Sequence, residues 1–331
     1  MRCASRWLAI GLGMGMALLG CSAPMAIGKV RAEATEDFPQ PWGAVGDNLV
    51  GSTIAPASPA PARRSAASAE LKPRDGAVMR PKAVAIVVGV ESYRVRLPKA
   101  TGAARDAALF AAFAERTLGL SRGNIKLLTD SDATRSSIDA VLDEWLGKNV
   151  DRDAELFFFF AGHGAPDVET GAGYLVPWDA DPKYIKTQGI AVDDLVARLA
   201  KAGAKQSYAF LDACFSGAGG RSVLAEGTRP LVRVRAPGAP RGTVSLLTAA
   251  GADETTGAAS SGHGLFSHHL LAGLNGRADA DRDGAITLEE LAAYTRAKVR
   301  DDAARDNREQ HPELIGSGGE AVLTRLPPPR D

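Results

Sequence analysis

A histidine and a cysteine each follow a strongly apolar stretch of this 331-residue chain. The first stretch is LFFFFAGHG, residues 156–164, which places His163 in a glycine-containing turn. The second is YAFLDACFSG, residues 208–217, which contains Cys214. Continuous apolar runs that end in turn residues are typical of strands buried on both faces of a parallel sheet. Ligand chemistry in open α/β sheets gathers at the carboxyl ends of the strands, so a thiol and an imidazole there predict a nucleophile–base pair for cysteine hydrolysis.

The three cysteines of the chain have separate expected fates. Cys3 lies in an N-terminal leader, Cys21 lies at the end of that leader, and Cys214 lies in the folded region. No two of them are expected to form a structural disulfide in the mature domain. Cys214 is therefore a free thiol, and it is either a small buried hydrophobe or a nucleophile.

The leader has the pattern of a secretion signal. Arg2 and Arg6 precede an apolar run over residues 7–19, which is too short for a comfortable membrane span. The run ends in LLGC at residues 18–21 and resembles the bacterial lipoprotein signal, which implies a signal peptide over residues 1–20 and lipidation of Cys21. We therefore expect a lipid-anchored protein of the cell envelope that faces the periplasm or the exterior. Ordinary secretion and an uncleaved anchor are the alternatives.

The composition divides the rest of the chain into a tether and a domain. Residues 21–81 lack apolar periodicity and include a Pro/Ala tract at 54–64, as expected of a flexible tether. Residues 82–326 alternate strand and helix signals, which predicts an α/β fold with a mostly parallel sheet flanked by helices. The formal net charge is zero, from 39 basic and 39 acidic residues, so bulk charge does not favour nucleic acid as a partner.

Individual elements follow from local patterns. Thr134 is expected to cap a helix, and residues 321–326 are expected to form a strand that closes the sheet. The remaining expected elements are strands at 84–90, 125–128 and 243–248, the two apolar strands that contain Phe157 and Tyr208, and helices at 105–118, 134–145, 193–200 and 265–274.

The two motifs together resemble the caspase-like superfamily, and they are most similar to bacterial metacaspase-like proteins. The resemblance rests on GHG at 162–164 and on DACFSG at 212–217, with support from GYLVP at 173–177 and GHGLFS at 262–267. The separation of 51 residues between His163 and Cys214 (214 − 163) is also similar to that in caspases. The resemblance covers nearly all of residues 82–326 and implies a caspase-like three-layer fold.

The resemblance implies a role for each residue of the two motifs. Cys214 would attack the substrate carbonyl, and His163 would protonate the departing amine. The backbone N–H groups of Gly164 and Cys214 would stabilise the negative oxygen. A glycine at position 164 would let the substrate approach without a Cβ in the way.

The resemblance also implies a specificity for basic residues. Caspases, which cleave after aspartate, carry glutamine at the position of Asp212, whereas the corresponding acid of metacaspases helps bind arginine or lysine. Asp106 matches a second acid of the family, and its alternative is an ordinary acid in the first turn of a helix. Ala161 stands where metacaspases commonly have serine, so one polar pocket contact is missing. His263, which also lies between two glycines, follows a polar turn and is interpreted as a loop residue.

A second motif, DADRDGAITLEE at residues 279–290, matches the EF-hand calcium loop. An acidic surface turn is the alternative, although such a turn would not need the glycine and the final glutamate at these offsets. The sequence therefore predicts one Ca²⁺ site near the C-terminal part of the domain. Its expected ligands are carboxylates, one backbone carbonyl and one water-linked position, supplied by Asp279, Asp281, Asp283, Ala285, Thr287 and Glu290.

The sequence thus predicts a lipid-anchored cysteine endopeptidase that cleaves peptides or proteins after arginine or lysine. The basic segment 221–242 is a candidate for self-cleavage, although a solvated loop is its ordinary interpretation. A non-catalytic, calcium-binding interaction module with the same fold is the alternative, and a different cysteine hydrolase is a third possibility.

Overall fold

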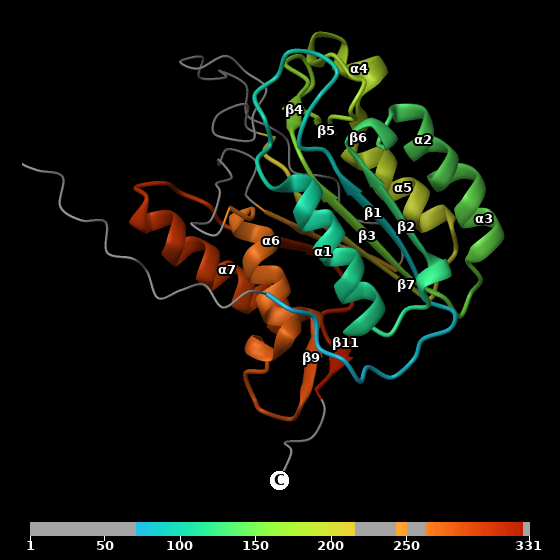
Figure 1. Cartoon of the computed structure of the whole chain (residues 1–331), viewed down its shortest axis with the longest axis vertical. Coiled ribbons are helices and arrows are strands. Elements are labelled where there is room, and N and C mark those ends of the chain that lie inside the picture. Colours follow the sequence, from blue (N-terminus) through green and yellow to red (C-terminus); the bar gives the residue numbers. More distant parts are fainter. Residues whose placement is uncertain (1–70, 216–242, 250–261, 327–331) are drawn as a thin grey trace, which may run out of the picture. The chain divides into compact units, whose positions relative to one another are not determined.

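In the computed structural model, residues 71–215, 243–249 and 262–326 are described. Their centre is a six-stranded sheet with the strand order β10-β8-β7-β3-β1-β2. Figure 1 labels β7, β3, β1 and β2 of this sheet. Five of these strands are parallel, and β10 pairs antiparallel with β8 at one edge. The bounds are β1 (Val84–Gly89), β2 (Ile125–Thr129), β3 (Glu155–Ala161), β7 (Gln206–Asp212), β8 (Val244–Thr248) and β10 (Glu313–Gly316).

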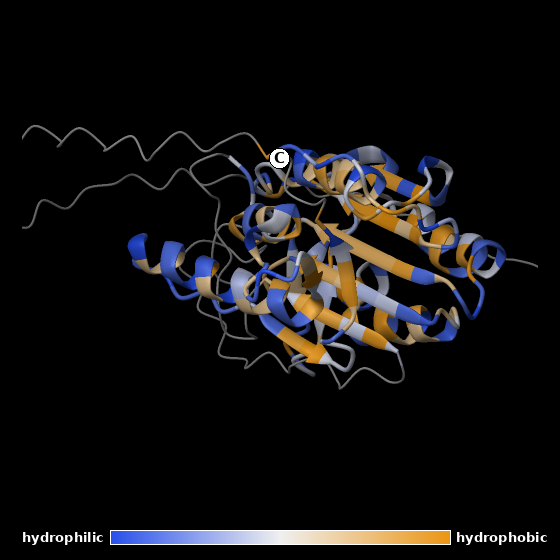
Figure 2. Cartoon of the chain, turned by 90° about the horizontal axis from the view of Figure 1, so that it is seen from below, coloured by the Kyte–Doolittle hydropathy of each residue, from blue (hydrophilic) through white to orange (hydrophobic). Residues whose placement is uncertain are grey.

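Helices cover both faces of this sheet, as predicted for a three-layer α/β fold. One face packs against α1 (Ala103–Arg116), α6 (Leu265–Ala272) with its extension η5 (Gly273–Arg277), and α7 (Leu288–Arg305). The other face packs against a second group of helical segments, namely α2 (Arg135–Ala140), η3 (Val141–Trp145), α3 (Leu146–Asn149) and α5 (Val192–Lys201). The apolar strands therefore lie between two helical layers whose outer surfaces are polar (Figure 2).

The phenylalanine run of β3 explains why this strand is central. Phe157 and Phe159 join the core on the side of α1, whereas Phe158 and Phe160 join the core on the side of α5. All four side chains are fully buried. Alternate residues of a strand point to opposite faces, so a strand with apolar residues at every position is stable only where both faces are covered.

A small antiparallel sheet follows β3 in the chain. It contains β4 (Gly164–Pro166), β5 (Gly173–Leu175) and β6 (Ile190–Ala191). Between β5 and β6 lie η4 (Pro182–Tyr184) and α4 (Ile185–Gln188). Two further short turns, η1 (Arg122–Asn124) and η2 (Asp130–Asp132), flank β2.

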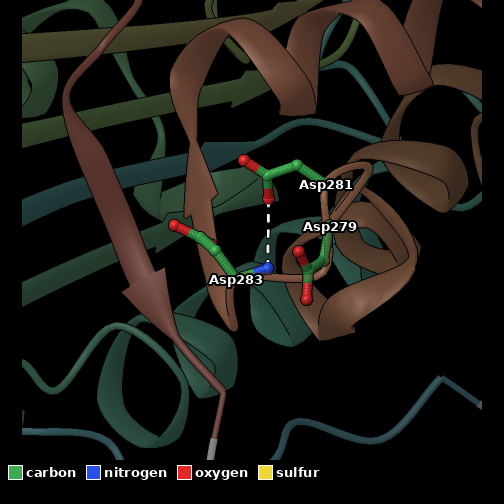
Figure 3. A group of neighbouring side chains, drawn as sticks. All are labelled: Asp279, Asp281 and Asp283. Atoms are coloured by element: carbon green, nitrogen blue, oxygen red, sulfur yellow. Dashed lines mark hydrogen bonds between the residues drawn. The ribbon is translucent and has the colours of Figure 1, made fainter.

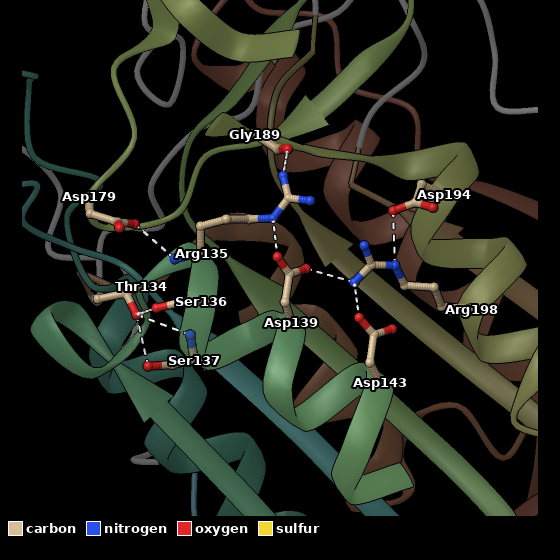
Figure 4. Close-up of polar contacts among 10 residues, drawn as sticks. All are labelled: Thr134, Arg135, Ser136, Ser137, Asp139, Asp143, Asp179, Gly189, Asp194 and Arg198. Atoms are coloured by element: carbon tan, nitrogen blue, oxygen red, sulfur yellow. Dashed lines mark hydrogen bonds and ion pairs between the residues drawn. The ribbon is translucent and has the colours of Figure 1, made fainter. Parts of the chain in front are cut away.

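Polar contacts hold α2 in place against its neighbours. The Thr134 side chain accepts a hydrogen bond from Ser137 N at 3.1 Å, which confirms Thr134 as the predicted cap. Asp139 receives Arg135 Nε at 2.7 Å and Arg198 Nη1 of α5 at 2.6 Å (Figure 4). Arg198 also contacts Asp194 of its own helix at 2.9 Å, and its pair with Asp139 joins α5 to α2.

The prediction that residues 321–326 close the main sheet is wrong. This segment forms β11 (Val322–Arg325), which pairs antiparallel with β9 (Ala285–Thr287) in a separate two-stranded sheet. The main sheet ends instead at β10, a strand that the sequence analysis did not identify. The pattern of β10 is weak because none of its four residues is fully buried, as is usual for an edge strand.

Residues 71–81, which the sequence analysis assigned to the tether, lie against the domain in this structure. Arg116 Nε pairs with Asp75 Oδ1 at 2.6 Å, and Arg80 donates to the Leu323 carbonyl at 2.7 Å. The signal peptide, Cys21, most of the tether and the basic segment at 221–242 lie outside the described residues. Within the described residues, no helix is long and apolar enough to cross a membrane.

Candidate active site

His163 and Cys214 lie at matching positions beyond two adjacent parallel strands. The register of β3 and β7 ends at the pair Ala161 and Asp212, and Gly162 N donates to Asp212 O at 3.2 Å. His163 and Cys214 each follow this last pair by two residues. The sheet therefore brings the two predicted catalytic residues to the same carboxyl edge, although 51 residues separate them in the chain (214 − 163).

The imidazole of His163 is held from two sides. His163 Nε2 lies 2.7 Å from the carbonyl oxygen of Pro98, and the Tyr93 ring stacks on the imidazole with centroids 5.0 Å apart. A carbonyl oxygen only accepts hydrogen bonds, so Nε2 must carry the proton. In the neutral ring, Nδ1 is then the nitrogen that can accept a proton. His163 N also donates to the Tyr93 hydroxyl at 2.6 Å, which fixes the backbone of the same residue.

Tyr93 and Pro98 are functional candidates that the sequence analysis missed. Both lie in the loop after β1, which pairs with β3 and ends at the same edge of the sheet. Their position after a buried parallel strand was a usable signal, but nothing in the sequence showed that this loop reaches His163. The contact depends on how the loop folds over the sheet edge.

Gly164 has a steric role that differs from the predicted one. A Cβ at this position would lie 2.5 Å from the Cys214 carbonyl oxygen and 2.9 Å from Phe215 Cδ1. The absent side chain therefore lets the histidine turn and the cysteine turn approach each other. The contribution of the Gly164 and Cys214 N–H groups to an oxyanion hole stays a prediction.

The side chains of His163 and Cys214 are both fully buried. A substrate carbonyl must come within bonding distance of the sulfur, and no substrate reaches a thiol with no exposed surface. In this structure the Cys214 sulfur is therefore not exposed to a substrate.

The two predicted specificity acids are buried at the same edge and are held by one segment. Asp106, in the first turn of α1, accepts hydrogen bonds from His263 Nδ1 and from Gly264 N, the latter at 2.8 Å. Asp212 accepts from Ser267 Oγ at 2.6 Å and from Ser267 N at 3.3 Å. Both carboxylates have no exposed surface. The segment 262–267 thus joins α1 to the end of β7.

His263 has a larger role than the sequence analysis gave it. It lies in the loop before α6, as interpreted, but its imidazole is paired with Asp106. Gly102 and Gly262 make this possible because a Cβ on Gly102 would lie 2.3 Å from the Gly262 carbonyl. Glycines on both sides of His263, directly before a helix, were the available signal for such a close approach.

The predicted calcium loop brings three carboxylates together. Oxygens of Asp279, Asp281 and Asp283 lie within 4.8 Å of one another (Figure 3). The loop turns at Gly284, where φ is +79°, a value that favours glycine. Asp279 Oδ1 is buried, with no hydrogen-bond partner among the described residues. Three convergent carboxylates and a buried oxygen fit a hard cation such as Ca²⁺.

The second half of the loop runs into α7. Glu290 accepts from Thr287 N and Thr287 Oγ, each at 2.9 Å, and from Ala280 N at 3.1 Å. Burial opposes ionisation of Glu290, but these hydrogen bonds outweigh it and lower the pKa of the carboxyl group. Ala285 begins β9, where it pairs with Arg325 of β11. The alternative of an acidic turn with a helix cap accounts for the contacts of Glu290 but not for the buried oxygen of Asp279.

Comparisons with known proteins identify the class. The family model of the caspase domain matches residues 82–318, and the chain belongs to this family of caspase-like proteins. No curated protein matches the chain. Among solved structures, caspase-1 from Spodoptera frugiperda is similar at 13% identity and a TM-score of 0.50, over 78% of this chain and 96% of that one.

A second solved structure, a protein from Geobacter sulfurreducens, is similar at 16% identity and a TM-score of 0.49, over 75% of this chain and 98% of that one. The family match confirms the predicted caspase fold, and it supports a cysteine-peptidase-like protein.

Proposed function

We propose that this protein is a cysteine endopeptidase with His163 and Cys214 as its catalytic pair. The observation that carries the proposal is the orientation of His163. Its Nε2 is bound to the Pro98 carbonyl, which leaves Nδ1 as the basic nitrogen of the ring. His163 follows β3, and Cys214 follows the adjacent strand β7. A base held in one tautomer beside a thiol is the arrangement that nucleophilic catalysis requires.

The reaction follows from these roles. His163 Nδ1 takes the proton of the Cys214 thiol, and the sulfur attacks the carbonyl carbon of the scissile peptide bond. N–H groups of Gly164 and Cys214 hold the negative oxygen of the tetrahedral intermediate. The C–N bond breaks as His163 returns the proton to the leaving amine, which leaves a thioester on Cys214. Water, deprotonated by His163, then releases the acid and restores the thiol.

The proposed preference is for arginine or lysine before the cleaved bond, with Asp106 and Asp212 as the binding acids. Two buried carboxylates at the edge that carries His163 and Cys214 support this proposal. Carboxylates shielded from water bind a guanidinium through strong, charge-assisted hydrogen bonds. His263 is part of the same site because it already pairs with Asp106.

We also propose that residues 279–290 bind one Ca²⁺. Bound Ca²⁺ would neutralise the carboxylates of the loop. Asp279, Asp281, Asp283 and Glu290 would supply these carboxylates, Ala285 its carbonyl oxygen and Thr287 a water-linked contact. Pairing of β9 with β11 supports the proposal because it holds one side of the loop in place.

The leader supports a further proposal about location. We infer lipidation of Cys21 after removal of residues 1–20, and hence attachment to a membrane of the cell envelope. Metabolic labelling with an alkyne fatty acid tests this inference in a bacterial host. Label on the wild type that is lost in Cys21→Ser is the expected result, and equal label on both proteins would contradict it.

The peptidase proposal is tested with a soluble chain that lacks the first 21 residues. Fluorogenic peptides ending in arginine, lysine or aspartate are compared with and without Ca²⁺, beside Cys214→Ala. Cleavage after arginine or lysine that disappears in the variant is expected. Cleavage after aspartate would contradict the assignment of Asp106 and Asp212.

A non-catalytic calcium-binding module is the second candidate, and the full burial of His163 and Cys214 favours it. A cellular phenotype that survives Cys214→Ala would support this candidate. Loss of that phenotype would support the peptidase.

A further inference from the structure

A cavity of about 570 Å³ opens between two segments that follow His163 in the chain. One wall is formed by residues 165–169, which include the end of β4. The other wall is formed by residues 182–187, which include η4 and the start of α4. The volume is sufficient for one or two amino-acid side chains and lies within the range of small-molecule sites.

The surface of this cavity is mainly apolar, although charged residues also line it, and part of the apolar lining is exposed. Val168 is 60% exposed and Tyr184 is 61% exposed, and both belong to the small set of large hydrophobic residues that are exposed in the described part of the chain. Ala165 and Ile185 lie deeper and are buried. Exposed apolar side chains that gather around a cavity mark a binding site more often than single ones do.

The two walls are already joined. Lys186 of α4 pairs with Glu169 and approaches Asp167 Oδ2 at 3.5 Å. Asp167 is almost fully buried and accepts from Glu169 N at 3.1 Å, so the loop after β4 is fixed from within. Burial opposes ionisation of Asp167, but hydrogen bonds from Thr170 and Glu169, together with Lys186, lower its pKa. A preformed cavity costs little conformational entropy when it binds a ligand.

The cavity is continuous with the packing around the catalytic histidine. Ala165 and Ile185 belong to a small apolar cluster against which Tyr93 packs, and Tyr93 stacks on the His163 ring. Ala165 is two residues beyond His163 and Asp167 is four residues beyond. At about 3.3 Å per residue of strand, the chain from His163 spans at most about 7 Å to Ala165 and at most about 13 Å to Asp167. These distances match two to four residues of an extended peptide.

We propose that this cavity binds an apolar side chain of the substrate, two to four residues from the cleaved bond. The proposal rests on the peptidase function and adds a second determinant of specificity. A peptide that is cleaved by this pair must lie beside His163, at the carboxyl edge of β3, and one wall of the cavity directly follows His163 in the chain. Burial of a leucine-sized side chain contributes enough to change affinity about tenfold or more.

The test uses quenched peptides with one arginine and with leucine or serine at each of four positions on either side of it. The wild type is expected to show about a tenfold higher kcat/KM for leucine at one position between two and four residues from the bond. The double variant Val168→Ser with Tyr184→Ser is expected to lose this preference. It should keep the kcat/KM of a minimal arginine amide, which does not reach the cavity.

Val78→Ser is the matched control, because Val78 is 74% exposed but lies outside this cavity. It should keep the leucine preference. Equal preference in the double variant and the wild type would overturn the proposal, as would a preference for leucine only at the position next to arginine.

A second measurement separates this proposal from the peptidase proposal. Fluorescence anisotropy of the same labelled peptides on Cys214→Ala reports binding without cleavage. Tighter binding of leucine peptides that is lost in the double variant would support the cavity even if no peptide is cleaved. Equal binding of leucine and serine peptides at every position would overturn it.

Discussion

Single atoms around His163 decide what the imidazole can do. The Pro98 carbonyl selects the tautomer, and the Tyr93 hydroxyl holds the backbone N–H of the same residue. Neither contact involves Nδ1, the proposed basic nitrogen. Both act by keeping the basic nitrogen in one orientation, and small changes in such supporting contacts commonly reduce activity.

Tyr93→Phe is expected to lower kcat while leaving the fold intact. The change removes the acceptor of His163 N but keeps the stacked ring. An N–H group that loses its partner lowers the stability of the local structure by about 1–3 kcal/mol. Steady-state kinetics on the best arginine peptide measure the effect. Tyr294→Phe, in α7 and away from His163 and from the proposed cavity, keeps its ring and should behave as the wild type. Equal kcat in Tyr93→Phe and the wild type would show that this contact does not support catalysis.

Gly164→Ala is expected to destabilise the protein by about 1–3 kcal/mol and to abolish activity, because its Cβ would overlap the Cys214 carbonyl. Urea unfolding measures the stability. The control is Gly147→Ala in α3, where a Cβ has nothing within 4 Å. That change should stabilise the protein by about 0.5–1 kcal/mol, since alanine favours a helix. Equal stabilities of the two variants would contradict the proposed close approach.

At the scale of elements, α6 is the helix with the greatest share in the site. Residues before and at its start hold Asp106 and Asp212, and its other end leads through η5 to the calcium loop. The helix is apolar on nearly all sides and contains two adjacent histidines in its middle. Burial lowers the pKa of both histidines.

His268 is expected to make the protein less stable as the pH falls from about 6.5 to about 4. Burial, with the positive charges of His269 and His263, lowers the pKa of His268 to about 4, from an ordinary value of 6.5. In this range the unfolded chain binds a proton that the folded protein excludes, so unfolding is favoured. Urea unfolding at pH 7, 6 and 5 measures the free energy. His268→Gln should make the dependence on pH shallower.

His311→Gln, which lies outside α6, is the control. Its free energy of unfolding should depend on pH as steeply as that of the wild type. The slope is compared rather than the stability at one pH, because glutamine changes the packing at every pH. An unchanged slope in His268→Gln would contradict the assignment.

At the scale of the whole molecule, the sequence predicted the elements that have a strong local pattern. The apolar runs of β3 and β7 and the cap at Thr134 were visible because local composition determines them. The family match then confirmed the fold. The partner of β11 was not predictable, because a four-residue strand carries no information about which edge it joins.

The residues of the site also divide into those that the sequence predicted and those that it did not. Positions of His163 and Cys214 followed from strands that end at one edge of the sheet. The roles of Tyr93, Pro98 and His263 did not follow, because each depends on a loop that folds onto a distant residue. Such contacts become visible only when the tertiary structure is known.

Calcium is expected to raise the melting temperature of the protein and its removal by EGTA to lower it. A ligand present at 100 times its Kd stabilises the folded state by about 2.7 kcal/mol. Glu290→Gln should lose most of this response, since Glu290 is the expected bidentate ligand. Glu289→Gln, an exposed neighbour on the same turn, should keep it. Equal melting curves of the wild type with and without Ca²⁺ would contradict the proposed site.

The helical stretch that begins at Leu265 is interrupted at Gly276, where φ is +106°. It lies between the segment that contacts Asp106 and Asp212 and the proposed Ca²⁺ loop. If Ca²⁺ and an arginine peptide bind as proposed and both displace this stretch, their binding is coupled. Such coupling is reciprocal: any factor by which Ca²⁺ increases the affinity for the peptide is the factor by which the peptide increases the affinity for Ca²⁺. A cell that supplies substrate would then also increase the amount of metal that each molecule carries.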